Sequence, residues 1–489
     1  MSIGEQTFGA FGTIRGSVYK ALPSLKTPLA IVLAFSVGWV ISNIPTPASL
    51  SGNGAQFLAT LVIGVVLWVS NAFDEYVVGF MLLASWVLLE IVPAKVALEG
   101  FSHESWFFVV AALGMGTAVV KSGLLQRIAA QILRRLPITA YKSHTFLLFA
   151  SGLLITPLLP TGKARVVVAL PVSQAIAQAT GFTTHSNGSA ALALSATIGF
   201  SQMSFVFLTG AESCLLGWNL LPEAAKAEFG WMTWLIAAFP AALFVFLFVF
   251  CSIHLLFRLP SKDRLDVQSR AKEFQVDNLG PLSNAEWIAV VVLLATLAGW
   301  ISVPLHGIGE TWIALLGLLA FLGTGILDKK SFKNDVDWTL ILFFGVVNSM
   351  AMVSRHLKVD RWLLEIIEPV LGSVALGPVT FLLAVVLIVF CARFFLRKAT
   401  AVLILPLLVM PYAQEIGIHP GVVLITILAA GECFLLTYQD GPYQIAYSST
   451  NGRAFTHTQA RKVLALKFLG TILAIAISVP YWTMLGLIK

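Results

Sequence analysis

Long apolar runs recur along the whole chain, and this feature restricts the possible folds more than any other. Runs of about 17 or more predominantly apolar residues alternate with short polar loops, and about 20 such residues form a helix that crosses a bilayer. The chain is 58% hydrophobic and 11% charged, whereas soluble domains carry about 25% charged residues. The sequence therefore predicts an all-α polytopic membrane protein.

We expect about 11 transmembrane helices together with two helical hairpins whose arms are too short to cross. The spans are predicted near residues 28–45, 56–72, 76–93, 105–120, 187–210, 231–256, 286–303, 309–326, 338–354, 421–438 and 463–486. The hairpins are predicted at 145–180 and 376–416. Two arms of about 15 residues each suit re-entrant hairpins that enter and leave the bilayer on one side.

Lysine and arginine in the short loops predict how the chain is oriented. Basic residues gather before the first span, before the first hairpin, in the loop 257–285 and after the eighth span, and positive loops are usually cytoplasmic. We therefore interpret the net charge of +7 as a topology signal and not as affinity for nucleic acid. No cleavable signal peptide is evident, so the first helix is expected to anchor the chain in the inner (plasma) membrane with its N-terminus cytoplasmic.

The same pattern predicts two halves. Residues 1–27 form a cytoplasmic N-terminal segment, 28–256 the first half with the hairpin 145–180, 257–285 a cytoplasmic linker, and 286–489 the second half with the hairpin 376–416. With these spans the two hairpins enter from opposite faces, as an inverted repeat requires.

Two short segments nearly repeat each other and place lysine in apolar surroundings. Lys163–Pro171 and Lys398–Pro406 align without a gap at their Lys, Ala, Val, Leu and Pro positions. A charge at membrane depth costs roughly 3 kcal/mol, so it normally marks a pathway or a binding site. Two such charges in corresponding halves predict a secondary transporter with paired broken helices at its midplane.

The span that follows each hairpin loses its helical pattern near its far end. The first break is predicted at Thr209–Ser213, which contains Glu212, and the second at Tyr438–Gln444, which contains Asp440. Gly and Pro beside a carboxylate indicate unwound backbone that lines a cavity. Glu212, Asp440 and Glu432 are candidates for proton coupling, and for the two break carboxylates the alternative is salt bridges with the two lysines.

These features resemble the divalent anion:sodium symporter family, within the wider ion transporter superfamily, over about residues 28–487. The resemblance lies in the two hairpins, in the Leu-Pro of each second arm and in the two unwound spans. In addition, Gly441–Tyr447 is similar to the family's Pro-Pro-Asn-Ala-Ile-Val-Tyr stretch. The resemblance implies scaffold and transport parts, a homodimer, and elevator-like alternating access.

The hairpin tips depart from that family. Its tips carry Ser-Asn-Thr, which holds substrate carboxylate and flanks a sodium site, whereas the tips here are Thr161-Gly162-Lys163 and Leu396-Arg397-Lys398. An ammonium group supplies the charge of a sodium ion covalently and keeps three donors for substrate oxygens. We therefore expect Lys163 and Lys398 to replace two sodium ions. The candidate substrate-binding residues are Thr161, Gly162, Lys163, Arg397, Lys398, Ala399, Thr400, Gly441 and Pro442.

The predicted function is secondary active transport of a small anion, with di- or tricarboxylates favoured over sulfate and sulfonates, by proton coupling or anion exchange. A sodium-coupled anion symporter and a cation/proton antiporter of the same superfamily are the alternatives, and the paired lysines argue against the antiporter. A channel is disfavoured because opposite-facing hairpins imply alternating access. The expected partners are a small anion, the lipid bilayer and a second copy of the chain.

An enzyme is not expected, because the sequence presents no catalytic constellation and no cluster of metal ligands. The four cysteines lack metal-ligand spacing and are interpreted as unreactive thiols. We therefore expect no cofactor, no metal and no nucleic-acid partner.

Overall fold

The computed structural model describes residues 26–43, 49–70, 72–125, 127, 128, 131, 141–258, 280–359, 361, 362, 365 and 377–489. Within these ranges the regular elements are helices, apart from one isolated bridge between Ile418 and Ile488. Seven helical segments are at least 18 residues long and apolar enough to cross a membrane, and five apolar helices are shorter. The all-α, multi-span fold predicted from the sequence is thereby confirmed. Most of the predicted segments 1–27 and 257–285 lies outside the described residues.

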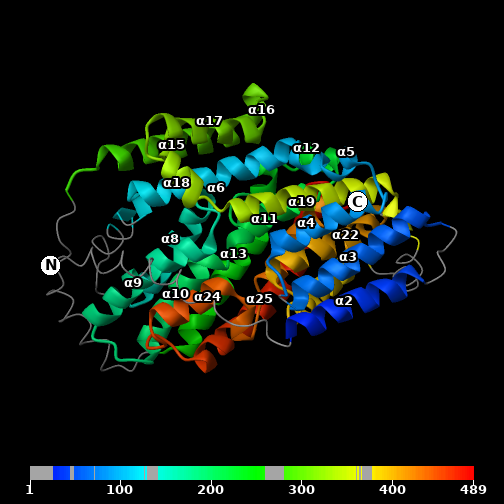
Figure 1. Cartoon of the computed structure of the whole chain (residues 1–489). Coiled ribbons are helices and arrows are strands. Elements are labelled where there is room, and N and C mark those ends of the chain that lie inside the picture. Colours follow the sequence, from blue (N-terminus) through cyan, green and yellow to red (C-terminus); the bar gives the residue numbers. More distant parts are fainter. Residues whose placement is uncertain are drawn as a thin grey trace. The chain divides into compact units, whose positions relative to one another are not determined.

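Residues up to Ala94 form one compact unit. Its described helices are α2 (Lys26–Ser42), α3 (Gly52–Ser70) and α4 (Glu75–Leu88), and α3 packs against both of the others (Figure 1). The indole of Trp86 donates a hydrogen bond to Thr60 Oγ1 at 3.0 Å. A Cβ at Gly64 would lie 2.9 Å from Leu82 Cδ1, so glycine allows α3 and α4 to approach closely.

Residues Lys95–Lys489 form the second unit, in which one order of elements occurs twice. The first series is α6 (Glu104–Ser122), α8 (Tyr141–Ile155), η2 (Thr156–Leu158), α9 (Gly162–Ala179), α10 (Asn187–Ser201), η3 (Ser204–Val206), α11 (Glu212–Asn219), α12 (Glu223–Glu228) and α13 (Trp231–Leu256). The second series is α19 (Trp338–His356), α21 (Pro378–Ala392), α22 (Lys398–Glu415), α23 (Pro420–Gly431), η5 (Thr437–Gln439), α24 (Gly441–Ser449) and α25 (His457–Met484).

Among the described residues, four helices lie between the two series, and two short elements directly precede the first series. The connecting helices are α15 (Asn284–Ile301), α16 (Val303–His306), α17 (Glu310–Gly323) and α18 (Lys329–Asn334). The preceding elements are α5 (Ala94–Ala97) and η1 (Glu99–Phe101). Both α15 and α17 pack against α6.

Helix pairs occupy the two predicted hairpin ranges. In the first pair, α8 passes into the η2 turn and α9 begins only at Gly162, because Pro157 and Pro160 lack the N–H that a continuing helix would need. In the second pair, α21 ends before Arg393 and α22 begins at Lys398. The two tips therefore place their lysines in the first turn of a helix.

The second arm of each hairpin packs on the broken helix of the other series. Helix α9 contacts α24, and α22 contacts α11. A Cβ at Gly217 of α11 would lie 3.2 Å from Val402 Cγ1 of α22, so glycine permits this close crossing. The long helices α13 and α25 pack along each other. Because α9 packs on α24 and α22 packs on α11, both hairpin tips and both breaks lie in one region.

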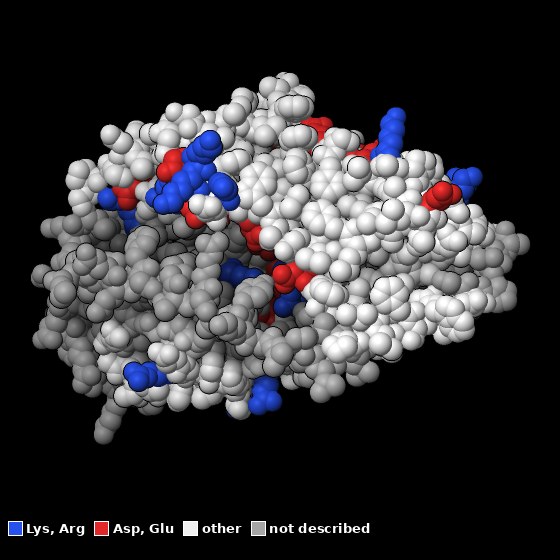
Figure 2. Space-filling view, in the orientation of Figure 1, with Lys and Arg blue, Asp and Glu red and all other residues white. Residues whose placement is uncertain are grey.

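Large apolar side chains on α15 and α17 are exposed, including Leu294 at 61% and Leu316 at 62%. Figure 2 shows wide areas of one face of the molecule without charged side chains. Such a surface suits contact with lipid acyl chains, where a charged side chain would be unfavourable.

Candidate functional site

The predicted site residues lie at helix ends in the second unit. Thr161 is the N-cap of α9, and Gly162 and Lys163 follow it. Arg397 is the N-cap of α22, and Lys398, Ala399 and Thr400 form its first turn. Asp440 is the N-cap of α24, before Gly441 and Pro442. Glu212 opens α11, and Glu432 is the C-cap of α23. Helix N-termini carry partial positive charge. The starts of α9, α11, α22 and α24 are therefore suited to an anion.

The tip of the first hairpin touches both breaks. A Cβ at Gly162 would lie 3.5 Å from Pro442 Cγ, and a Cβ at Gly441 would lie 3.1 Å from Lys163 Cε. The backbone N–H of Glu212 donates to Pro160 O at 3.0 Å. The structure therefore brings Gly162, Lys163, Gly441 and Pro442 together. Lys163 and Arg397 are exposed, while Thr400 is buried.

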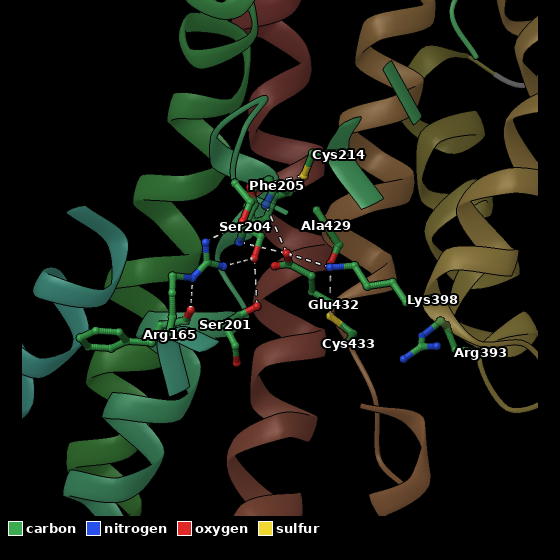
Figure 3. A network of polar contacts seen from close by, with 12 residues as sticks. Arg165, Ser201, Ser204, Phe205, Cys214, Arg393, Lys398, Ala429, Glu432 and Cys433 are labelled. Atoms are coloured by element: carbon green, nitrogen blue, oxygen red, sulfur yellow. Dashed lines mark hydrogen bonds and ion pairs between the residues drawn. The ribbon is translucent and has the colours of Figure 1, made fainter. Parts of the chain in front are cut away.

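The tip of the second hairpin is tied to the first break through Glu432. Lys398 Nζ lies 3.2 Å from Glu432 Oε1, and the two side chains are 22% and 1% exposed. The same oxygen accepts hydrogen bonds from the backbone N–H groups of Ser204, at 2.9 Å, and Phe205, at 3.2 Å. Glu432 Oε2 is buried and has no hydrogen-bond partner within the described part of the chain. Figure 3 shows Glu432 between Lys398 and the backbone of Ser204 and Phe205.

Arg165 lies two residues after Lys163 but turns into the protein, where it is 1% exposed. Its guanidinium donates five hydrogen bonds of 2.5–3.0 Å to four main-chain oxygens and one hydroxyl. The acceptors are Thr156 O, Leu159 O, Phe200 O, Gly210 O and Ser204 Oγ. Arg165 therefore joins the first hairpin to the first break through four backbone oxygens and the hydroxyl of Ser204.

Arg393 makes the corresponding connection in the second series. It is 1% exposed and donates to Leu396 O at 3.1 Å and to Gln439 O. The Gln439 amide returns a hydrogen bond to Arg393 O at 2.8 Å. Gly210 and Gln439 each precede the N-cap residue of the helix after the break. Each hairpin thus contributes one arginine that bonds the equivalent carbonyl of its own series.

Lys467 of α25 is a basic residue of the site that the sequence reasoning missed. It is 0% exposed, and its ammonium donates to the main-chain oxygen of Glu432 at 3.0 Å and lies 4.0 Å from Cys433 Sγ. The signal was present, because Lys467 lies within the predicted apolar span 463–486. The roles of Arg165 and Arg393 had no comparable signal, because their acceptors are backbone oxygens distant in sequence.

These groups form one electrostatic cluster of five basic and four acidic side chains. Lys163, Lys398 and Arg165 attract Glu212, while Asp337, the N-cap of α19, repels it. Lys398, Arg393 and Lys467 attract Asp440, and Glu432 attracts Arg165. Asp440 also caps α24 by accepting from the Tyr443 N–H at 2.8 Å. We call these nine residues the charge cluster: Lys163, Arg165, Arg393, Lys398, Lys467, Glu212, Asp337, Glu432 and Asp440.

Basic side chains outnumber acidic ones in the charge cluster. An anion can be held at membrane depth only where cationic groups offset its charge, so this balance suits an anionic substrate. No group of three or more His, Cys, Asp or Glu side chains able to hold a metal ion occurs in the described ranges.

Helices that can cross a membrane, two broken spans and a charge cluster where hairpin tips meet define a multi-pass membrane transport protein. Comparison with known proteins makes the class specific. Residues 25–488 match the family described as the sodium:sulfate symporter transmembrane region. The chain belongs to this family of divalent anion:sodium symporters, as the resemblance of its motifs indicated.

Individual relatives have low sequence identity but match most of the chain. Dicarboxylate transporter 1, chloroplastic, of Spinacia oleracea is 26% identical over 384 residues, covering 77% of this chain and 67% of the relative. Inner membrane protein YbhI of Escherichia coli is 23% identical over 397 residues, covering 79% and 83%. Among solved structures, the YdaH transporter of Alcanivorax borkumensis has a similar fold, with a TM-score of 0.53 at 15% identity over 94% of this chain and 97% of that one.

Proposed function

We propose that this protein is a secondary active transporter of small organic anions, dicarboxylates or tricarboxylates, that works without sodium. The observation that carries the proposal is the charge cluster, in which basic side chains outnumber acidic ones where both hairpin tips and both breaks meet. The naming of the spinach relative as a dicarboxylate transporter supports the same substrate class.

Lys163 and Lys398 are the proposed contacts for the substrate carboxylates. Lys163 is exposed and lies over Gly441, where the N-terminus of α24 adds the partial positive charge of its helix dipole. Lys398 is partly exposed and has three N–H donors, of which Glu432 needs one. Each ammonium can therefore bind a substrate oxygen, and together they supply the two charges that two sodium ions would otherwise provide.

Without sodium, transport is driven by protons or by exchange of one anion for another. Glu432 is the proposed proton carrier, because its Oε2 is buried with no hydrogen-bond partner among the described residues and its Oε1 is shared with Lys398. Substrate that draws Lys398 away leaves Glu432 without its ion-pair partner. Glu212 and Asp440 remain further candidates; Asp440 also has the structural task of capping α24.

The remaining parts of the proposal concern assembly and motion. The transporter is proposed to be a homodimer in the inner (plasma) membrane, with the N-terminus cytoplasmic and elevator-like alternating access. The two series of elements in the second unit form the basis for the proposed inverted repeat.

A sodium-coupled symporter is the second candidate function, favoured by the description of the family that matches residues 25–488. A cation/proton antiporter has less support, because basic side chains outnumber acidic ones in the charge cluster.

The test is counterflow in proteoliposomes loaded with unlabelled succinate, with labelled succinate outside. Lys163→Ala and Lys398→Ala should each lower the rate about tenfold or more, since each removes a charge-assisted hydrogen bond worth about 1.5–3 kcal/mol. The control is Lys95→Ala, which removes an exposed lysine outside the charge cluster and should leave the rate unchanged. Equal rates in all three variants would refute the assignment of the two lysines.

A further inference from the structure

Four backbone oxygens and one hydroxyl converge on Arg165, and they come from segments that are separate in sequence. Thr156 and Leu159 belong to the first hairpin, Phe200 to the end of α10, and Ser204 and Gly210 to the break after it. In transporters, unwound backbone carbonyls and helix C-terminal ends are the groups that coordinate a monovalent cation. We call these five oxygens the oxygen cage.

The guanidinium of Arg165 occupies this cage. All three nitrogens of Arg165 face the cage oxygens at 2.5–3.0 Å: Nε bonds Phe200 O, Nη2 bonds Ser204 Oγ, and the two N–H groups of Nη1 are shared among the other three. The side chain is 1% exposed, so bulk water does not solvate the guanidinium. Removing the guanidinium would take these donors from five buried oxygens, which should lower the melting temperature.

We propose that Arg165 is a built-in cation that holds the position of a sodium ion in the first half of the site. The inference rests on the proposed function, and it moves the role of sodium replacement in this half from Lys163 to Arg165. A sodium ion does not fit within the cage, because the guanidinium already bonds its five oxygens. Lys163, which is exposed, is thereby left free of this task and available to the substrate.

Arg165 is a positioning residue in this account and not a substrate contact. Its charge acts on Glu212 and Glu432, and its hydrogen bond to Gly210 O fixes the backbone just before α11. In the second half two cations bond carbonyls beside the break, since Arg393 bonds Gln439 O and Lys467 bonds Glu432 O. Both breaks are therefore held by side chains of the protein itself.

The test is to empty the cage and ask whether a free cation fills it. Arg165→Ala is purified and its thermal unfolding is followed in choline chloride, in sodium chloride and with millimolar guanidinium added to choline chloride. Counterflow of labelled succinate is measured in the same three media. The expected result is a low melting temperature and slow transport in choline, both raised by sodium or guanidinium. The control is Arg355→Ala, whose side chain is 34% exposed and lies outside the cage.

A melting temperature of Arg165→Ala that sodium and guanidinium raise, with no such effect in the wild type or in Arg355→Ala, supports the cage. A folded Arg165→Ala that responds to neither cation overturns it. If wild-type transport itself requires sodium, the proposed function fails, whereas the cage is still judged by the cation-dependent stability of Arg165→Ala.

If Arg165→Ala does not fold in any medium, two conservative variants test whether the charge of Arg165 is needed. Arg165→Lys keeps the charge, whereas Arg165→Gln is shorter and keeps amide donors without the charge. Transport in choline by Arg165→Lys that exceeds that of Arg165→Gln about tenfold or more supports a built-in cation. Equal transport by the two variants shows that hydrogen bonding alone is needed and overturns the proposal.

Discussion

Lys467 Nζ lies 3.0 Å from the main-chain oxygen of Glu432, so a lysine with no exposed surface caps the C-terminal end of α23. The side chain of the same glutamate holds Lys398 at 3.2 Å. Glu432 thus lies between two lysines, one bound through its backbone and the other through its carboxylate. The C-terminal end of a helix carries partial negative charge, which makes the backbone oxygen a suitable partner for a buried ammonium.

Lys467→Met is expected to destabilise the protein. Methionine matches the length of the lysine stem, but the Glu432 carbonyl is left without its donor, at a cost of about 1–3 kcal/mol. The measurement is the melting temperature of detergent-purified protein. Lys462→Met, on the same helix but exposed, is the matched control and should change stability by no more than about 0.5 kcal/mol. Identical melting temperatures for the two variants would contradict a structural role for Lys467.

Glu432→Gln is expected to separate binding from coupling. The amide oxygen can still accept from the backbone of Ser204 and Phe205, but the side chain can no longer gain or lose a proton. Counterflow of succinate should persist, while accumulation driven by an imposed pH gradient should disappear.

The control for that variant is Glu228→Gln, which alters a 76% exposed carboxylate outside the charge cluster. It should behave as the wild type in both assays. Accumulation by Glu432→Gln in response to the pH gradient would exclude Glu432 as the proton carrier and leave Glu212 and Asp440 to be tested in the same way.

Asp440→Ala is expected to weaken the start of α24. The carboxylate accepts from the Tyr443 N–H at 2.8 Å, and replacing an N-cap aspartate by alanine costs about 1 kcal/mol. Asp440→Asn keeps a good cap and should retain most of the stability, as read from melting temperatures. If both variants are equally destabilised, the negative charge of Asp440 matters more than its cap.

The sequence predicted the elements of this site better than their connections. Lysine at both tips and Gly-Pro at the breaks are local signals, and they led to Lys163, Lys398 and Gly441. The break itself begins earlier than predicted, because α10 ends at Ser201 and the helix resumes at Glu212. That difference reflects the carbonyls bonded by Arg165, which stabilise nonhelical backbone that the residue types alone do not reveal.

The ion-pair partner of Lys398 could not be predicted from local sequence patterns either. Its partner in the structure is Glu432, 34 residues away, and not the break carboxylates that the alternative interpretation favoured. The pair forms because α22 packs beside α23. Lys467 shows the same limit, since only the tertiary fold reveals that a lysine of the last span caps α23.

A cluster around Glu223, on the short helix α12 between spans, is expected to make stability depend on pH. Glu223 Oε1 lies 3.0 Å from Lys226 Nζ, 3.3 Å from His103 Nε2 and 3.8 Å from Arg355 Nη1. Burial acts to raise the pKa of Glu223, but these cationic neighbours more than offset it and hold the pKa below its usual value. The stabilisation is therefore present above the ordinary glutamate pKa and is lost as the pH falls through the lowered one.

The check is the melting temperature of wild type and Glu223→Gln at pH 7 and at pH 4 or below. The two proteins should differ more at pH 7, by about 1 kcal/mol or less, because the Glu223 side chain is 54% exposed and its ion pairs are screened by water. Glu99→Gln, which alters an exposed glutamate, is the control. A difference that grows as the pH falls would contradict this sign.

The most direct test of the account is wild-type counterflow of labelled succinate in proteoliposomes with all sodium replaced by choline. The account predicts saturable uptake at the same rate in choline and in sodium, because Arg165 and Lys398 supply the positive charge that sodium ions would bring. Uptake that appears only when sodium is added would contradict it.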